Sequence, residues 1–225
     1  MRKITPIAHI RTDFSTKFGI PRQSGLVKEL EGKIVFEPEF RNMEALRGLE
    51  AFSHIWLIWE FSQAGKDEWS PTVRPPRLGG NQRMGVFATR SPFRPNPIGL
   101  SCVELKGIEQ DGKLGPVLHV LGADLMDLTP VLDIKPYVPL ADSHPEASGG
   151  FSDAVQDYGL EVCFPEKWLN LIPREKRAAL IGALRQDPRP AYQNDPDRIY
   201  GFAFAGFEIR FQVKEQMLTV CEVEE

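Results

Sequence analysis

The sequence predicts a mainly β protein, with an N-terminal closed β-barrel-like domain and a small C-terminal α+β domain. Short β-compatible segments separated by turn signals fill residues 1–140, where helical periodicity is scarce. Residues 141–160 are mostly small, polar or acidic, which is typical of a linker. Residues 161–225 combine one helical stripe with alternating aromatic residues. We therefore expect domains at residues 1–140 and 161–225, joined by that linker.

The first half of the N-terminal domain contains three predicted strands and one short helix. Residues 4–12 and 32–36 have strand-like composition. Asn42 is a suitable N-cap for a short helix over residues 43–50. Residues 52–61 are apolar on both faces, so we expect a strand that is covered on both sides or lines a barrel.

The second half of this domain contains further strands around a central loop. Residues 85–89 and 98–109 are predicted strands on either side of the loop. Asp111 and Gly112 are a strong hairpin signal, which returns the chain into a strand over residues 116–121.

The C-terminal domain begins with a predicted helix. Residues 168–185 carry apolar side chains at helical spacing, and Pro173 suits a first-turn position. Apolar residues then alternate over residues 200–213 and 218–223, which predicts an aromatic β-hairpin.

Composition argues against several classes of protein. A chain of 225 residues with 42% hydrophobic residues can bury a substantial core. The longest apolar run, residues 55–59, is too short to span a bilayer, and the N-terminus has no signal-peptide pattern. We therefore expect a cytoplasmic protein. Its three cysteines are widely spaced and form no CxxC pair, so we expect no disulfide framework and no metal site.

Positive charge is concentrated in one stretch of an otherwise acidic chain. The formal net charge is −4, which disfavours indiscriminate binding of nucleic acid. Between Trp69 and Val103, however, there are five arginines and no lysine, aspartate or glutamate. A nucleic-acid partner is therefore expected at a defined patch. Pairing of these arginines with acids inside the fold is the alternative.

The backbone of this arginine stretch, Arg74–Ser101, is predicted to be rigid. Ser91, Arg94 and Asn96 each precede a proline, which holds them in extended conformations. Residues 79–81, Gly-Gly-Asn, can approach a ligand closely. Arginine without lysine favours paired or stacked recognition. We interpret the stretch as a preorganised loop that grips an anion or ligand; the alternative is a proline-rich turn with solvated arginines.

Motifs for several common catalytic chemistries are absent from the sequence. There is no GxGxxG or P-loop, no HExxH and no GxSxG, so nothing marks a nucleotide fold of those types or a covalent nucleophile. Arginines, prolines and a few aspartates remain, and these suit group transfer from an activated donor. One or more of Asp124, Asp127 and Asp133 could face the arginine loop.

Six segments of the chain resemble a known family. They are PRQSG at residues 21–25, GLEAFSHIWLIWEF at 48–61, RPPRLGGN at 74–81, GVFATRSPFRPNPIGLS at 85–101, DIKPY at 133–137 and DPRPAYQ at 187–193. In this order they are similar to the TsaA-like family, which includes bacterial tRNA (adenine-N6)-methyltransferases. The likeness covers nearly the whole chain.

The resemblance implies a fold and a reaction. Members are β-barrel methyltransferases without the Rossmann fold, and they act as homodimers with the donor near the subunit interface. The implied cofactor is S-adenosyl-L-methionine. The implied reaction converts N6-threonylcarbamoyladenosine, at adenine 37 beside the anticodon of threonine tRNA, to its N6-methyl form.

The resemblance also implies site residues. For tRNA contact we expect Arg77, Arg83, Lys135, Arg189 and Tyr192, with solvated surface charge as the alternative for each cation. The implied donor-binding residues are Gln23, Ser24, Gly25, Gln63, Arg90, Ser91, Leu100, Asp127, Leu128, Thr129 and Pro130.

Three residues are candidates for catalysis. Asp133 and Tyr137 would orient or deprotonate the acceptor nitrogen, although Asp133 could equally pair with a loop arginine. Arg94, or else Arg90, would face a carboxylate or phosphate.

Two other functions remain open from the sequence. A non-catalytic sensor of S-adenosylmethionine or a nucleotide would use the same pocket without transferring a group. A proline-rich scaffold for protein partners would bind no small ligand.

Overall fold

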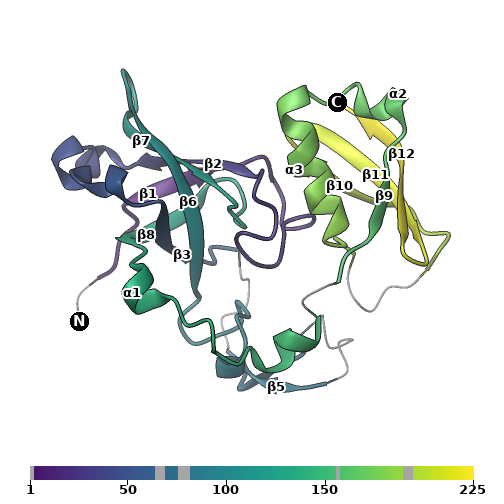
Figure 1. Ribbon diagram of the computed structural model, residues 1–225, viewed down its shortest axis with the longest axis horizontal. Coiled ribbons are helices and arrows are strands. Elements are labelled where there is room, and N and C mark those ends of the chain that lie inside the picture. The colour runs from purple at the N-terminus through teal and green to yellow at the C-terminus, as the bar shows by residue number, and fades with distance from the viewer. Residues whose placement is uncertain (1–2, 64–68, 76–81, 156–157, 190–194) are drawn as a thin grey trace.

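The computed structural model describes residues 3–63, 69–75, 82–155, 158–189 and 195–225. Figure 1 shows two bodies, a barrel built from the N-terminal part of the chain and a smaller sheet with helices built from the C-terminal part. This confirms the predicted mainly β fold class, with a closed barrel and a small α+β unit. Within the described residues, no helix combines the length and apolar character needed to cross a membrane.

Six antiparallel strands close the barrel in the order β1-β2-β7-β6-β3-β8. The barrel closes because β1 pairs with β2 on one side and with β8 on the other. Its strands are β1 (Ala8–Arg11), β2 (Glu31–Phe36), β3 (His54–Glu60), β6 (Ile98–Asp111), β7 (Gly115–Leu121) and β8 (Thr129–Pro136).

Inward and outward side chains alternate along the barrel strands. In β3 the inward residues Ile55, Leu57 and Trp59 are buried, and the residues between them are only half-buried. This segment was expected either to be covered on both sides or to line a barrel, and it lines the barrel. One face of an antiparallel strand in a barrel packs on the core, and the other can lie near solvent.

Short elements connect the strands and differ from the sequence prediction at two places. Asn42 is an N-cap as predicted, accepting a bond from the Glu44 amide, but the helix expected over residues 43–50 is divided into two 3₁₀ turns. Residues 85–89 were expected to form one strand, but only their start lies in a strand and a 3₁₀ turn follows. These connecting elements are η1 (Pro38–Phe40), η2 (Met43–Leu46), η3 (Leu49–Ala51), β4 (Thr72–Val73), β5 (Met84–Gly85) and η5 (Val86–Ala88).

The predicted linker contains local structure, and the predicted C-terminal helix is divided in two. The shorter helix ends at Leu169, and Pro173, with extended backbone angles, is the N-cap of the longer one. The elements are α1 (Pro139–Asp142), η6 (Gly150–Val155), β9 (Glu161–Cys163), α2 (Glu166–Leu169) and α3 (Arg174–Arg185).

The aromatic alternation near the C-terminus forms β10 (Tyr200–Phe204), β11 (Phe207–Lys214) and β12 (Met217–Glu224), as predicted. These strands join β9 in a four-stranded sheet, and helix α3 packs beside it (Figure 1). We call β9 to β12 with α2 and α3 the C-terminal module.

The connection between β1 and β2, residues 12–30, belongs to both bodies. Its Phe14, Val27 and Leu30 are buried in the hydrophobic core of the C-terminal module, not in that of the barrel. An ion pair of 2.7 Å joins Asp13 to Lys176 of α3. We call residues 12–30 the β1–β2 segment. It ties the two bodies together through apolar burial and a half-buried ion pair.

Candidate active site

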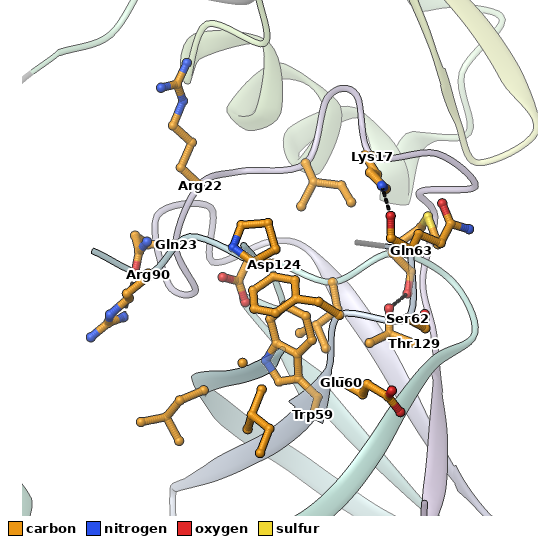
Figure 2. Close-up of a pocket in the computed structure, with 18 of the residues that line it drawn as sticks. Lys17, Arg22, Gln23, Trp59, Glu60, Ser62, Gln63, Arg90, Asp124 and Thr129 are labelled. Carbon is orange, nitrogen blue, oxygen red and sulfur yellow. Dashed lines mark hydrogen bonds between the residues drawn. The ribbon is translucent and has the colours of Figure 1, made fainter. Parts of the chain in front are cut away.

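A cavity of about 730 Å³ opens at one end of the barrel. Strand β3 runs antiparallel to β6 and β8, so its last residues meet the first residues of both neighbours at this end. The β1–β2 segment and the arginine loop supply the remaining walls (Figure 2). The volume lies in the range of small-molecule and cofactor sites.

Aromatic rings form the apolar part of this cavity. Trp59 is only 8% exposed, and its ring centroid lies 4.2 Å from that of Phe61. Gly99 pairs with Trp59 across the β3–β6 ladder. A Cβ on Gly99 would lie 2.2 Å from Cε2 of the indole, so only glycine allows the ring to lie across the strand. The arrangement offers a flat apolar surface within the cavity.

A chain of hydrogen bonds leads from this ring to a carboxylate. The Trp59 Nε1–H donates to Ser101 Oγ at 3.0 Å, and the Ser101 hydroxyl donates to Asp124 Oδ1 at 2.6 Å. Burial raises the pKa of the Asp124 carboxyl, against the opposing effects of the Ser101 bond and the positive charge of Arg90. The sequence analysis expected at least one aspartate to face the arginine loop, and Asp124 does so.

The arginine loop forms one wall of the cavity. Arg90 donates from Nη1 to Gln23 Oε1 at 2.6 Å, which joins this loop to the β1–β2 segment. Arg94 donates from Nη1 to the carbonyl oxygens of Thr89, at 3.0 Å, and Ser91, at 3.5 Å. Its guanidinium therefore braces the loop from within. Residues 79–81, expected to approach a ligand, lie outside the described residues.

The β1–β2 segment forms the opposite wall. The Gly25 amide donates to the Gly122 carbonyl at 2.9 Å, and the Ser24 hydroxyl accepts from the Cys102 amide at 3.1 Å. Gly25 has a φ of +78° and lies in close contact with Gly122, so both positions require glycine. In Figure 2 the Arg22 side chain points away from the other labelled side chains, toward the C-terminal module, while Gln23 lies beside Arg90.

Five of the predicted donor-binding residues line the cavity, and the other six lie behind its walls. Asp127 accepts at Oδ1 from Arg11 Nε and the Thr12 amide, each at 3.0 Å, so it holds the start of the β1–β2 segment. Leu128, with a φ of +63°, is exposed outside the cavity. The lining residues are Gln23, Gln63, Arg90, Leu100 and Thr129; the others are Ser24, Gly25, Ser91, Asp127, Leu128 and Pro130.

Of the three predicted catalytic residues, the structure places only Arg94 in the cavity wall. Asp133 pairs with Ile58 in the β3–β8 ladder, and its carboxylate lies 2.9 Å from the ammonium of Lys135. Partners directly opposite in such a ladder share a face, and Ile58 points outward. A β-bulge between Ile58 and Trp59 shifts the register, so Asp133 faces outward although Val131, two residues earlier, faces inward.

Tyr137 follows β8 on the same outer side. Its ring lies 5.8 Å from that of Trp56 and 6.1 Å from that of His54, centroid to centroid. The structure therefore separates Asp133 and Tyr137 from the residues that line the cavity.

The predicted tRNA-contact residues have different environments. Arg83 is exposed, whereas Lys135 is engaged with Asp133. Arg189 is 8% exposed and donates to both carboxylate oxygens of Asp187, at 2.8 and 2.9 Å, so it is not the solvated surface charge that was the alternative. Arg77 and Tyr192 lie outside the described residues.

Several cavity residues were not identified from the sequence as functional. Trp59 and Phe61 were expected only as strand residues, and Phe93 and Lys17 were not singled out. No local motif marks them, because they meet only when distant segments pack together. The available sequence signal was Gly99, since an isolated glycine in a strand often marks a site where a ligand or another segment comes close. In the structure it pairs with Trp59.

Comparison with known proteins agrees with this architecture. A family model described as the tRNA-methyltransferase O N-terminal domain matches residues 9–143, and one described as the TrmO C-terminal domain matches residues 159–225. An Escherichia coli (strain K12) protein named tRNA (adenine(37)-N6)-methyltransferase is 43% identical over 97% of this chain and 96% of its own length.

A protein sequence and a solved structure from Pseudomonas aeruginosa are similar along nearly the whole chain. One, named putative S-adenosylmethionine-dependent methyltransferase RcsF, is 47% identical over 98% of this chain and 96% of its own. The other is the crystal structure of TrmO from that organism, with a TM-score of 0.79 and 35% identity over 100% of both chains. The cavity, the barrel that carries it and these matches lead to one conclusion: the chain belongs to the tRNA-methyltransferase O family.

Proposed function

We propose that the chain is an S-adenosylmethionine-dependent tRNA (adenine(37)-N6)-methyltransferase. It converts N6-threonylcarbamoyladenosine to its N6-methyl form in threonine tRNA. The observation that carries this proposal is the barrel-end cavity, with its aromatic floor, its buried carboxylate and its arginine wall. The Escherichia coli enzyme of that name is 43% identical over 97% of this chain, which supports the same activity.

The residues of the cavity fit the donor chemically. Trp59 and Phe61 provide flat apolar surface for a purine ring. Arg90 provides charge-assisted donors for a carboxylate, and Gln23, bonded to it, fixes its orientation. Asp124 provides buried carboxyl oxygens that can accept from hydroxyl or ammonium groups. The aromatic rings, the guanidinium and the carboxyl group thus suit the purine, the carboxylate, and the hydroxyl and ammonium groups of S-adenosylmethionine.

The chain serves the reaction by placement. The donor supplies a methyl group that is already activated on a sulfonium. The braced arginine loop and the β1–β2 segment hold the reactants in line and keep water from the reacting atoms. No covalent intermediate with the chain is needed. We place Ser24, Gly25, Ser91, Asp127, Leu128 and Pro130 in this role as supports of the donor walls, and Gln63, Leu100 and Thr129 in direct contact.

Asp133 and Tyr137 remain our candidates on the acceptor side, where the N6 proton must be released. They lie on the outer face of the barrel, so the acceptor would approach along β8. Asp133→Ala should slow transfer with little change in donor affinity, whereas Arg94→Ala should weaken donor or acceptor binding. Unchanged turnover in both variants would remove these two assignments.

We also propose a homodimer in the cytoplasm. Ile98 and Leu100 at the start of β6 also line the cavity; they are 40% and 48% exposed and support a subunit contact at its edge. The proposed tRNA substrate supports the cytoplasmic location. Sedimentation equilibrium should give a dimer; a monomer at micromolar concentration would refute it.

We propose that residues 1–140 form the donor site, that residues 141–160 are the linker, and that residues 161–225 share in tRNA contact with residues 1–140. Arg83, Arg77, Lys135 and Tyr192 are the proposed contacts. Arg189 would act by orienting its own segment through Asp187. Tyr192→Ala, which removes the proposed contact in residues 161–225, should lower tRNA affinity without abolishing donor binding.

The deciding experiment incubates the protein with methyl-labelled S-adenosylmethionine and threonine tRNA, with or without the threonylcarbamoyl group. We expect label only on the threonylcarbamoylated tRNA. Stabilisation of the protein by the donor without any transfer of label would instead favour the sensor. Failure of the donor to stabilise the protein would favour the scaffold and refute the enzyme.

A further inference from the structure

Two aromatic rings lie exposed beside the cavity and belong to neither hydrophobic core. Trp69 is 51% exposed and Phe87 is 73% exposed. Their ring centroids are 6.3 Å apart and their planes differ by 27°, so the rings are stacked. Among the residues that the structure describes, neither ring is part of the barrel core or of the C-terminal module's core. Burial therefore does not explain why large apolar side chains occupy these positions.

Backbone pairing holds the two rings together. Thr72 pairs with Gly85 in the short β4–β5 ribbon, and the Val86 amide donates to the Pro71 carbonyl at 3.0 Å. Trp69 enters this ribbon on one side and Phe87 leaves it on the other. The ribbon lies at the bottom of Figure 1, away from the β6–β7 turn at the top.

The ring pair is connected directly to the cavity rim. Val86 is 1% exposed and anchors η5, so the next residue, Phe87, is directed into solvent. The Thr89 amide donates to the Val86 carbonyl at 3.1 Å, and Thr89 and Arg90 line the cavity. A ligand that extends out of the cavity over this rim would meet the rings.

The electrostatic surroundings select the kind of ligand. From Trp69 to Val103 the sequence has no aspartate or glutamate, although Asp67 and Glu68 directly precede Trp69. Arg74 and Arg83 are exposed in this stretch, and neither has an ion-pair partner within the part of the chain that the structure describes. Stacked rings on a stretch that carries exposed arginines match an unpaired nucleobase between phosphates. Such a cationic stretch in an acidic chain suits a polyanion better than a second copy of this chain.

From this geometry we propose that Trp69 and Phe87 form a stacking platform for an unpaired RNA base next to the nucleotide that enters the cavity. The proposal rests on the proposed function and adds a recognition site to it. Stacking accepts any base, so the platform contributes affinity and register, and sequence preference must arise elsewhere.

Substitution of either ring tests the platform. Trp69→Ala and Phe87→Ala should each raise the KM for tRNA and the Kd for an anticodon stem-loop RNA by about 5- to 150-fold, the range for loss of one base stack. The Kd for S-adenosylmethionine should not change. The matched control is Leu114→Ala, which shortens an exposed apolar side chain at the β6–β7 turn and should leave both constants unchanged.

A second set of variants separates stacking from simple apolar contact. Phe87→Tyr and Trp69→Phe keep a ring and should retain binding within about threefold, whereas Phe87→Leu should lose as much as Phe87→Ala. Quenching of tryptophan fluorescence by the stem-loop should be smaller in Trp69→Phe than in wild type, since only Trp56, Trp59 and Trp168 remain.

Two results would overturn the platform. One is unchanged stem-loop affinity in both alanine variants. The other is full binding by Phe87→Leu, or a change of oligomeric state in Phe87→Ala, which would assign the rings to a protein contact. The stem-loop assay needs no chemistry, so it decides the platform even if the wild-type protein transferred no methyl group. That last outcome would refute the proposed function separately.

Discussion

Ser101→Ala should destabilise the protein markedly, although it removes a single oxygen. The Ser101 side chain is fully buried, and its hydroxyl accepts from the Trp59 indole while donating to Asp124. Alanine keeps the Cβ and creates little space. The substitution therefore isolates the two hydrogen bonds.

The expected loss follows from the groups left without partners. A buried Trp59 N–H without an acceptor costs about 1–3 kcal/mol, and a bond to the charged Asp124 is worth about 1.5–3 kcal/mol. The two effects share one network and are not additive, so we expect roughly 2–4 kcal/mol in the free energy of unfolding. For a chain of this size that lowers Tm by about 5–15 °C.

The loss should depend on pH in a defined direction. Burial already raises the pKa of Asp124, and the Ser101 bond opposes that shift by favouring the charged form. Removing the bond therefore costs most above the folded-state pKa of Asp124. As pH falls through that pKa the carboxyl is protonated and the cost shrinks toward the Trp59 contribution alone.

Urea unfolding of Ser101→Ala and wild type at several pH values measures both effects. The matched control is Ser70→Ala, which removes an exposed hydroxyl that donates to the Thr72 carbonyl and should change stability by under about 0.5 kcal/mol. In the double variant with Asp124→Asn, the pH dependence should disappear. A loss below about 0.5 kcal/mol, or one that does not vary with pH, would refute this account of the network.

Three further predictions test the cavity walls. Asp124→Asn should raise the free energy of unfolding at neutral pH, because burial raises the pKa of Asp124 and so penalises its charged form; the gain should fade as pH falls through that pKa, and a gain equal at all pH values in urea titrations would contradict it. Gly99→Ala should cost about 1–3 kcal/mol and weaken donor binding, because Trp59 must move; unchanged near-ultraviolet circular dichroism and donor affinity would show otherwise. Lys176→Met should raise the donor KM severalfold without changing the tRNA KM, because it removes the ion pair that holds the β1–β2 segment to α3. The control Arg210→Met breaks ion pairs within the C-terminal sheet and should leave the donor KM unchanged. Equal donor KM values in the two variants would refute the coupling.

Much of the fold was readable from short-range patterns. The aromatic alternation after Tyr200 predicted the C-terminal strands, and Asp111-Gly112 predicted the β6–β7 turn, because strand period and turn chemistry depend only on neighbouring residues. The rigidity of the arginine loop was predicted for the same reason, since proline restricts its own residue and the one before it.

The sequence was least informative where a local pattern meets contacts between distant residues. Asp133 was proposed as a catalytic residue from family likeness alone, and no sequence period reveals the bulge that turns it to the outer face of the barrel. Arg189 was expected at the surface or on tRNA, yet Asp187, two residues away, holds it in a buried ion pair. Pro173 was placed inside a helix that in fact starts after it.

The sequence by itself determined a β barrel, a small α+β module and an arginine loop without acids, because alternation, turn signals and proline geometry act over a few residues. The family came from the resemblance of six sequence segments. Only the tertiary structure decided that Asp124 is the aspartate facing Arg90, that Trp59 lies across Gly99, and that the β1–β2 segment is buried in the core of the C-terminal module. Those contacts join residues far apart in the chain, and their energies depend on burial and register, which exist only once both bodies have folded against each other.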